Sequence, residues 1–125
     1  MSELGAAQRF EDPRGRLTVL PLDDAPFEVT RAYVISDVPL NARRGGHAYR
    51  SQHRLLVVIS GTVLLTLDDG RRSRTLELTG GDTIHIEPGI WHELEAVAEP
   101  VAIAVLADGV HDPSDKVADR SQLPL

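Results

Sequence analysis

The side chains best suited to acid–base chemistry lie in one short stretch, RGGHAYRSQHR at positions 44–54. His47 and Tyr49 lie two residues apart, so an extended backbone points both toward one face, and His53 is expected on that face as well. Four arginines lie between positions 43 and 54 without one acidic residue. An imidazole exchanges protons near neutral pH, and a local positive field attracts anions. The stretch therefore predicts a site for an anionic small molecule with a polar reacting centre.

The overall composition excludes several other kinds of site. The chain has 125 residues, enough for one core, and residues 1–125 are expected to form a single domain. The lack of cysteine excludes disulfides, thiolate metal sites and a cysteine nucleophile. A net charge of −6 argues against a nucleic-acid polymer, whose binding needs a basic face across many phosphates. With no apolar stretch long enough for a membrane span and no signal peptide, we expect a cytoplasmic protein without a membrane partner.

Apolar runs and turn signals predict a fold made of short strands. The run LLVVI at 55–59 is apolar at every position, so it predicts a strand buried on both faces, which would end at Gly61. Turn signals at DPRG (12–15), DDG (68–70) and PG (88–89) separate the other apolar segments. The expected strands cover residues 17–20, 27–35, 54–60, 62–67, 73–78, 83–86, 91–97 and 101–106.

Short strands without a long helix are typical of an all-β sandwich or barrel. The order of the glycine turns favours a cupin-type jelly roll, also called a double-stranded β-helix. Residues 36–46 are expected to form a loop, whereas 1–7 and 112–125 are expected to be peripheral tails, the second with at most one helical turn. A sheet that curls into a barrel brings strand ends together, and cupins place their site inside the barrel mouth.

Six short motifs, in order and at matching spacing, resemble the dTDP-sugar 3,4-ketoisomerases of the cupin superfamily. They are DPRG at 12–15, RAY at 31–33, RGGHAYR at 44–50, SG at 60–61, LDDG at 67–70 and PGIWHE at 88–93. Members of this family convert dTDP-4-keto-6-deoxyglucose into a 3-keto sugar during deoxysugar biosynthesis. The resemblance therefore implies a sugar isomerase that needs no cofactor.

Moving a ketone from C4 to C3 takes a proton from C3, forms an enediol and returns a proton at C4, without a redox step. The resemblance implies that His47 is the base, a task that suits a neutral imidazole. Tyr49 and Tyr33 are the candidates to hydrogen-bond the O3/O4 pair and to stabilise the enediolate.

The resemblance also suggests residues that bind the substrate. Arg14 and Arg44 are candidates for the diphosphate or the sugar oxygens, because a guanidinium binds such groups through two parallel N–H donors. Trp91 could line the cavity, although the core also suits this residue. His92 lies on the opposite strand face from Trp91 and could point toward His47.

His85 and His111 have no counterpart in the resemblance, so we expect both at the surface.

The resemblance also bears on the assembly. Family members typically exchange N-terminal strands between subunits, which implies a homodimer. In such a dimer Arg14 and Tyr33 would approach His47 of the other subunit.

Two departures from the family pattern keep other functions open. Many members have a second histidine where this chain has Tyr49, and a glutamate where it has His53. The general cupin metal motif would use these two positions together with His47 and His92, and three histidines suit Zn²⁺, Ni²⁺ or Fe²⁺. A metal-dependent cupin enzyme that uses His47, His53 and His92 is therefore one alternative to the metal-free site. A non-catalytic sugar-binding module is another.

Overall fold

Two long antiparallel strands, β6 (Arg54–Asp68) and β9 (Trp91–Ala107), form the frame of the computed structural model, which describes residues 3–125. They pair along their whole length, from Arg54 opposite Ala107 to Asp68 opposite Trp91. The sequence predicted two separate strands in place of each, and this prediction is wrong. Each of the two strands is continuous, so β6 and β9 position side chains at both ends of the molecule.

The end predicted at Gly61 is a bend inside β6. The pairing register between β6 and β9 shifts between Val58 and Val63, which curves the ladder without ending it. Gly61 has a φ of +78°, and a Cβ at this position would lie 2.6 Å from the carbonyl oxygens of both Ala98 and Pro100. Glycine is therefore required for the close approach of the two strands, not for a turn.

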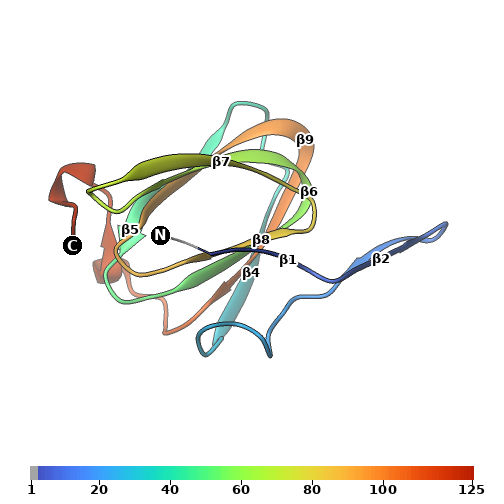
Figure 1. Cartoon of the computed structure of the whole chain (residues 1–125), viewed down its shortest axis with the longest axis horizontal. Coiled ribbons are helices and arrows are strands. Elements are labelled where there is room, and N and C mark those ends of the chain that lie inside the picture. Colours follow the sequence, from blue (N-terminus) through green and yellow to red (C-terminus); the bar gives the residue numbers. More distant parts are fainter. Residues whose placement is uncertain (1–2) are drawn as a thin grey trace.

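The other strands extend this frame into one curled sheet of order β1-β8-β6-β9-β5-β10, with β4 paired to β9 and β7 paired to β6 (Figure 1). The described residues contain two short 3₁₀ turns, Pro113–Asp115 and Arg120–Gln122, and no longer helix. The predicted all-β, cupin-type fold is thus confirmed. The remaining strands are β1 (Glu3–Ala6), β2 (Arg9–Asp12), β3 (Gly15–Thr18), β4 (Arg31–Ser36), β5 (Arg43–Tyr49), β7 (Ser73–Thr79), β8 (Asp82–Ile86) and β10 (Lys116–Val117).

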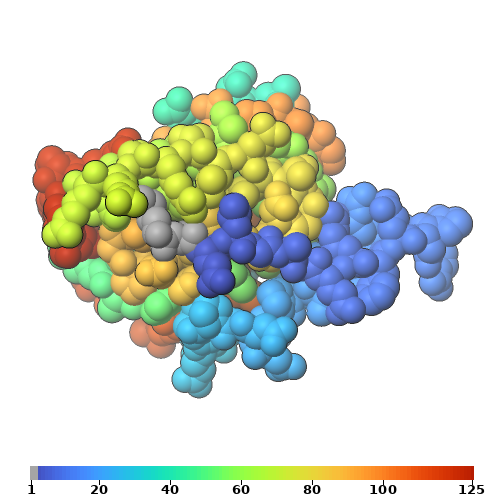
Figure 2. Space-filling view, viewed as in Figure 1, coloured from blue at the N-terminus to red at the C-terminus, as the bar shows by residue number. Residues whose placement is uncertain are grey.

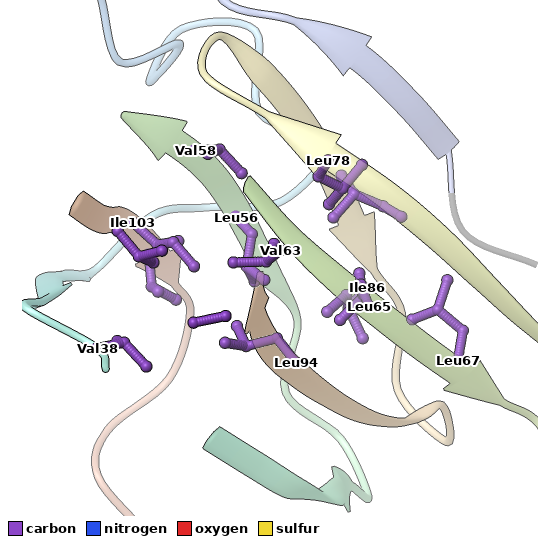
Figure 3. Packing of buried hydrophobic residues seen from close by; sticks show 14 of the residues in the cluster. Val38, Leu56, Val58, Val63, Leu65, Leu67, Leu78, Ile86, Leu94 and Ile103 are labelled. Carbon is purple, nitrogen blue, oxygen red and sulfur yellow. The ribbon is translucent and has the colours of Figure 1, made fainter. Parts of the chain in front are cut away.

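The hydrophobic core lies inside the curled sheet (Figure 3). In the second half of β6, Val63, Leu65 and Leu67 are buried, while the residues between them are partly exposed. The first half is buried at every position from Arg54 to Val58, as predicted, whereas Ile59, the last residue of the apolar run, is partly exposed. Fully burying one such aliphatic side chain is worth about 1.5–3 kcal/mol. The core therefore holds the two central strands rigidly.

A two-stranded hairpin of β2 and β3 extends away from this body (Figures 1 and 2). Its turn follows the DPRG signal, with Asp12 opposite Gly15. Phe10 and Leu17 lie opposite each other on the hairpin, and they are 55% and 59% exposed. The hairpin thus offers apolar side chains outside the core of its own chain.

Both predicted tails contribute strands. β1 pairs with β8, and β10 pairs with β5 through Lys116 opposite Tyr49 and Val117 opposite Ala48. These strands are four and two residues long, too short for a periodic pattern to reveal them. Residues 1–2 of the first predicted tail lie outside the described residues.

Three further boundaries differ from the predictions. The strand expected over 17–20 is β3, which covers Gly15–Thr18. The strand expected from residue 27 begins at Arg31, and the loop expected over 36–46 ends at residue 42, where β5 follows. No helix within residues 3–125 is long and apolar enough to cross a membrane.

Candidate active site

A cavity of about 320 Å³ opens between β4, β5, β6, β9 and the C-terminal segment. A volume of this order suits a small-molecule site. Five of the predicted site residues meet at its wall: Tyr33, Arg44, His47, Tyr49 and His92. The complete lining consists of Arg31, Tyr33, Ile35, Arg44, Gly45, His47, Tyr49, Gln52, Arg54, Leu56, His92, Leu94, Val105, His111, Asp112 and Lys116.

A bulge in β5 places His47 inside the cavity. Gly45 and Gly46 have φ values of +92° and +80°, and the register with β9 shifts between Gly45 and His47. After the shift His47 lies opposite His92. A Cβ on Gly45 would lie 2.9 Å from the His92 carbonyl oxygen, so the glycine permits this close approach.

Three rings face one another in this part of the cavity. The His47 Nε2 and the Tyr49 hydroxyl oxygen are 3.0 Å apart, a hydrogen-bond distance. The His92 ring centroid lies 5.1 Å from that of His47 and 5.8 Å from that of Tyr49. The alternation expected for His47 and Tyr49, and the approach of His92 to His47, are therefore present in the structure.

Both imidazoles of this group are neutral at neutral pH. Burial lowers the pKa of His47 to about 4, and the positive charges of Lys116 and Arg54 act in the same direction. Burial also lowers the pKa of His92 to about 4, although a hydrogen bond to the Ile90 carbonyl acts in the opposite direction. Since the Nδ1–H of His92 donates to that carbonyl at 3.0 Å, its Nε2 is the acceptor nitrogen. Neutral imidazoles can accept protons.

Arg54 is a central residue of the site that the sequence analysis did not select. The residue is 3% exposed, and its guanidinium carbon lies 3.9 Å from the centroid of the Tyr49 ring. The Arg54 Nε donates to the Tyr33 hydroxyl at 3.3 Å. A signal was present in the sequence, because Arg54 alternates with Leu56 and Val58, which face the core. Period-2 geometry therefore points Arg54 inward.

The C-terminal segment completes the cavity wall, which the sequence analysis did not predict either. His111, Asp112 and Lys116 line the cavity. His111 is exposed, as expected, but it also lies at the cavity wall. Asp115 holds this segment in place: its carboxylate accepts hydrogen bonds from the Ser51 amide, the Ser51 hydroxyl and the Gln52 amide at 2.7–3.3 Å.

Arg14 lies outside the cavity of its own chain. It sits in the turn of the β2–β3 hairpin, where its side chain is 90% exposed and its Nη2 contacts the Asp12 carboxylate at 2.6 Å. Tyr33, in contrast, reaches the cavity of the same chain through the body strand β4. Tyr33 therefore lines the same cavity as His47 of its own chain, whereas we expected it to approach His47 of another subunit.

Trp91, assigned to substrate binding from the sequence, lies on the outer side of this cavity wall. Its indole N–H donates to the Ala118 carbonyl at 3.3 Å, and the Arg120 guanidinium lies 4.2 Å from its ring centroid. Neighbouring residues of a strand point to opposite faces, so Trp91 turns outward where His92 turns inward. Trp91 therefore packs the C-terminal segment against β9.

His53 also lies away from the cavity, contrary to the expectation. Its Nδ1 is 2.8 Å from the His85 Nε2, and both rings contact Phe27. β5 ends at Tyr49, so the alternation that aligns His47 and Tyr49 does not continue to His53. The alternative ligand set of His47, His53 and His92 is not assembled. Within residues 3–125 no three His, Cys, Asp or Glu side chains are grouped to hold a metal ion.

Comparisons with known proteins identify the family of this chain. A family model described as "FdtA: WxcM-like, C-terminal" matches residues 2–123. The chain is 29% identical over 112 residues to a TDP-4-oxo-6-deoxy-α-D-glucose-3,4-oxoisomerase from Aneurinibacillus thermoaerophilus, covering 88% of this chain and 81% of the relative.

Solved structures of the 3,4-ketoisomerase QdtA from Thermoanaerobacterium thermosaccharolyticum are also similar. A double mutant in complex with TDP is 28% identical with a TM-score of 0.85, covering 96% of this chain and 88% of that one. A variant in complex with TDP-4-keto-6-deoxyglucose is 25% identical, with a TM-score of 0.85 and the same coverage. With its sequence matched almost end to end, the chain belongs to the FdtA family, and its resemblance to the sugar 3,4-ketoisomerases is confirmed.

Proposed function

We propose that this protein is a nucleotide-sugar isomerase that converts dTDP-4-keto-6-deoxyglucose to a dTDP-3-keto-6-deoxyhexose. The observation that carries the proposal is the contact of His47 with Tyr49 in a cavity where both imidazoles, His47 and His92, are neutral. The relatives named above are oxoisomerases or ketoisomerases of TDP-sugars, and two QdtA structures hold TDP or the keto sugar. The same substrate class follows for this chain.

His47 is the base in this proposal. Its neutral ring takes the C3 proton, and the C3–H electron pair forms a C3–C4 double bond while charge moves onto O4. A proton then passes from O3 to O4, the ketone forms at C3, and the His47 imidazolium returns a proton to C4. The proton removed at C3 is replaced at C4 and the electron pair stays in the sugar, so the cycle needs no cofactor. A positioned base of this kind supplies about 10²–10⁴ in rate.

Tyr49 and Tyr33 supply hydroxyl groups for the O3/O4 pair. The Tyr49 hydroxyl lies beside the base, and the Tyr33 hydroxyl accepts a hydrogen bond from Arg54, which leaves its own O–H available to donate. Burial raises the pKa of Tyr49, so this phenol is protonated at neutral pH and can donate as well. Donors placed where negative charge develops stabilise the transition state.

The diphosphate lies along the cationic rim of the cavity. Arg31, Arg44 and Lys116 line the cavity, with Asp112 as the acidic lining residue. A guanidinium such as that of Arg44 suits phosphate oxygens, and excess positive charge attracts a dianion. Because about 320 Å³ is small for a whole nucleotide sugar, the sugar occupies the cavity and the nucleotide extends beyond it.

The proposal includes a homodimer in which the N-terminal hairpin packs on the other subunit. The hairpin exposes Phe10 and Leu17, and Val34 on β4 is 65% exposed. β4 pairs with β9 along one edge, and no described strand pairs with its other edge. An open edge next to exposed apolar side chains suits a partner strand. Such an exchange would bring Arg14 toward the second subunit. A cytoplasmic enzyme is also part of the proposal.

Nuclear magnetic resonance of dTDP-4-keto-6-deoxyglucose with the purified protein in D₂O tests the function. We expect the C3 proton to exchange with solvent and 3-keto sugar signals to appear. Binding without exchange would instead identify a sugar-binding module. Activity that EDTA abolishes and one divalent ion restores would identify a metal-dependent enzyme.

A further inference from the structure

Arg54 is a buried cation without a carboxylate partner. The residue is 3% exposed, and its three hydrogen bonds go to neutral acceptors: the Tyr33 hydroxyl at 3.3 Å, the His53 carbonyl at 3.0 Å and the Gln52 side-chain oxygen at 3.1 Å. Among residues 3–125, no Asp or Glu forms an ion pair with Arg54. A charge in this position is costly unless an anion compensates it.

The other charged groups at the cavity do not supply that anion. Arg31, Arg44 and Lys116 are cations, and the carboxylate of Asp112 accepts hydrogen bonds from the Ser114 amide and hydroxyl. The cavity therefore has excess positive charge, with its most buried cation in the wall beside Tyr33 and Tyr49. The compensating anion has to come with the ligand.

Arg54 also contacts the groups assigned to the reaction. Its guanidinium covers one face of the Tyr49 ring at 3.9 Å and donates to the hydroxyl of Tyr33. Both tyrosines thus have a positive charge against them, which strengthens their hydroxyl groups as hydrogen-bond donors. A guanidinium carries five N–H donors, so donors remain for a bound oxygen after its three hydrogen bonds.

We propose that Arg54 is a catalytic residue that stabilises the negative charge on the enediolate, directly and through the hydroxyl groups of Tyr33 and Tyr49. The inference rests on the proposed function, since the anion in question is the intermediate of that reaction. When His47 removes the C3 proton, charge develops on O4, and it moves to O3 as the proton passes from O3 to O4. Arg54 offsets this charge at both stages.

The test compares Arg54→Gln and Arg54→Lys with Arg120→Gln. Arg120 also places its guanidinium over an aromatic ring, that of Trp91, but it lies outside the cavity, so it is a matched control. We expect Arg54→Gln to lower kcat, and the rate of C3 proton exchange in D₂O, by about 10²-fold or more. TDP, which lacks the keto sugar, should bind within a few-fold of wild type. Arg54→Lys should recover part of the rate, and Arg120→Gln should keep all of it.

A readout without turnover separates this role from a structural one. The chain has two tyrosines, so in a Tyr33→Phe background the absorbance of tyrosinate reports Tyr49 alone. Removing the Arg54 charge should then raise the pKa of Tyr49, because Arg54 lowers it. An unchanged Tyr49 titration would overturn the electrostatic role.

The two proposals fail in different ways. If wild-type protein exchanges no C3 proton, the proposed function is wrong, and the enediolate with it. If wild-type protein is active and folded Arg54→Gln keeps its kcat, the function stands and the role of Arg54 is wrong. A loss of TDP binding equal to the loss in kcat would also overturn it, because Arg54 would then serve ground-state binding.

Discussion

The Nε2 atom of His47 lies 3.0 Å from the hydroxyl oxygen of Tyr49, its neighbour two residues along β5. The two side chains share a face because the strand is extended, and the bulge at Gly45 turns that face toward His92. Because the His47 base contacts the Tyr49 phenol, the two groups together can transfer protons at both substrate oxygens, O3 and O4.

Replacing the base should remove turnover without removing binding. In His47→Asn we expect kcat to fall by about 10² or more, while TDP affinity changes by a few-fold at most. His85→Asn is the control, because His85 contacts His53 and Phe27 outside the cavity. Steady-state kinetics and TDP titration check the prediction. A wild-type rate in His47→Asn would remove this histidine from the mechanism.

The two tyrosines should matter more for rate than for stability. Tyr49→Phe and Tyr33→Phe keep the ring and lose one hydroxyl, so the free energy of unfolding should fall by about 1 kcal/mol. We expect turnover to fall by a larger factor, because each hydroxyl faces the charge that develops in the reaction. Urea denaturation and kinetics on the same preparations check this. A large loss of stability with normal activity per folded molecule would identify the tyrosines as structural.

The buried histidines should make the fold sensitive to mild acid. His92 has a pKa of about 4 when folded against 6.5 for an ordinary histidine, so the unfolded chain binds the proton first. Its contribution to stability is complete above pH 6.5 and is lost as the pH falls toward 4. Between pH 7.5 and 5 we expect a loss of about 2 kcal/mol from His92.

Urea denaturation at both pH values, at one protein concentration, measures that loss. His92→Gln should reduce it, whereas His111→Gln, at an exposed position, should leave it unchanged. Equal pH dependence in wild type and His92→Gln would contradict the assignment.

Asp115 should link the C-terminal segment to catalysis. Asp115→Ala removes the acceptor for the backbone amides of Ser51 and Gln52, and hydrogen bonds to charged groups are worth about 1.5–3 kcal/mol each. We expect lower stability and, because Lys116 loses its support, a higher KM for the nucleotide sugar. Asp119→Ala removes a carboxylate that accepts a hydrogen bond from the Ser121 amide on an exposed turn, and it should change little. An unchanged KM in folded Asp115→Ala would separate this segment from substrate binding.

Assembly should depend on the N-terminal hairpin. Light scattering of the wild-type protein at micromolar concentration should give the mass of a dimer, and Phe10→Asp with Leu17→Asp should give a monomer, because charges replace apolar side chains at the contact. Inactive His47→Asn and Arg14→Ala proteins, unfolded and refolded together, should regain up to about half of the activity of one site per heterodimer. A fully active monomer would rule out the shared site.

The sequence predicted those features that depend on neighbouring residues. Extended geometry placed His47 beside Tyr49, and alternation placed Trp91 and His92 on opposite faces of their strand, although Trp91 does not line the cavity as expected. The metal ligand set failed because β5 ends before His53. Lys116 reaches the cavity on a two-residue strand whose partner lies more than sixty positions earlier in the chain, and no local pattern reveals such a contact. The inward direction of the Arg54 side chain follows from its alternation with Leu56, but only once the inward face of the strand is known.

The register of β6 against β9 also has a consequence for the order of folding. Asp68 and Trp91 are 23 positions apart in the sequence, whereas Arg54 and Ala107 are 53 positions apart, so the loop that the second pair closes contains the first. Shorter loops close at a smaller entropy cost, so pairing proceeds from the Asp68 end toward Arg54. The end that carries Arg54 is therefore the last part of this ladder to form. His92 lines the cavity from the Asp68 end and Arg54 lines it from the other, so the cavity is complete only after this last pairing. Slower proton exchange of the backbone amides near Leu67 than near Leu55 in a refolding pulse would record that order.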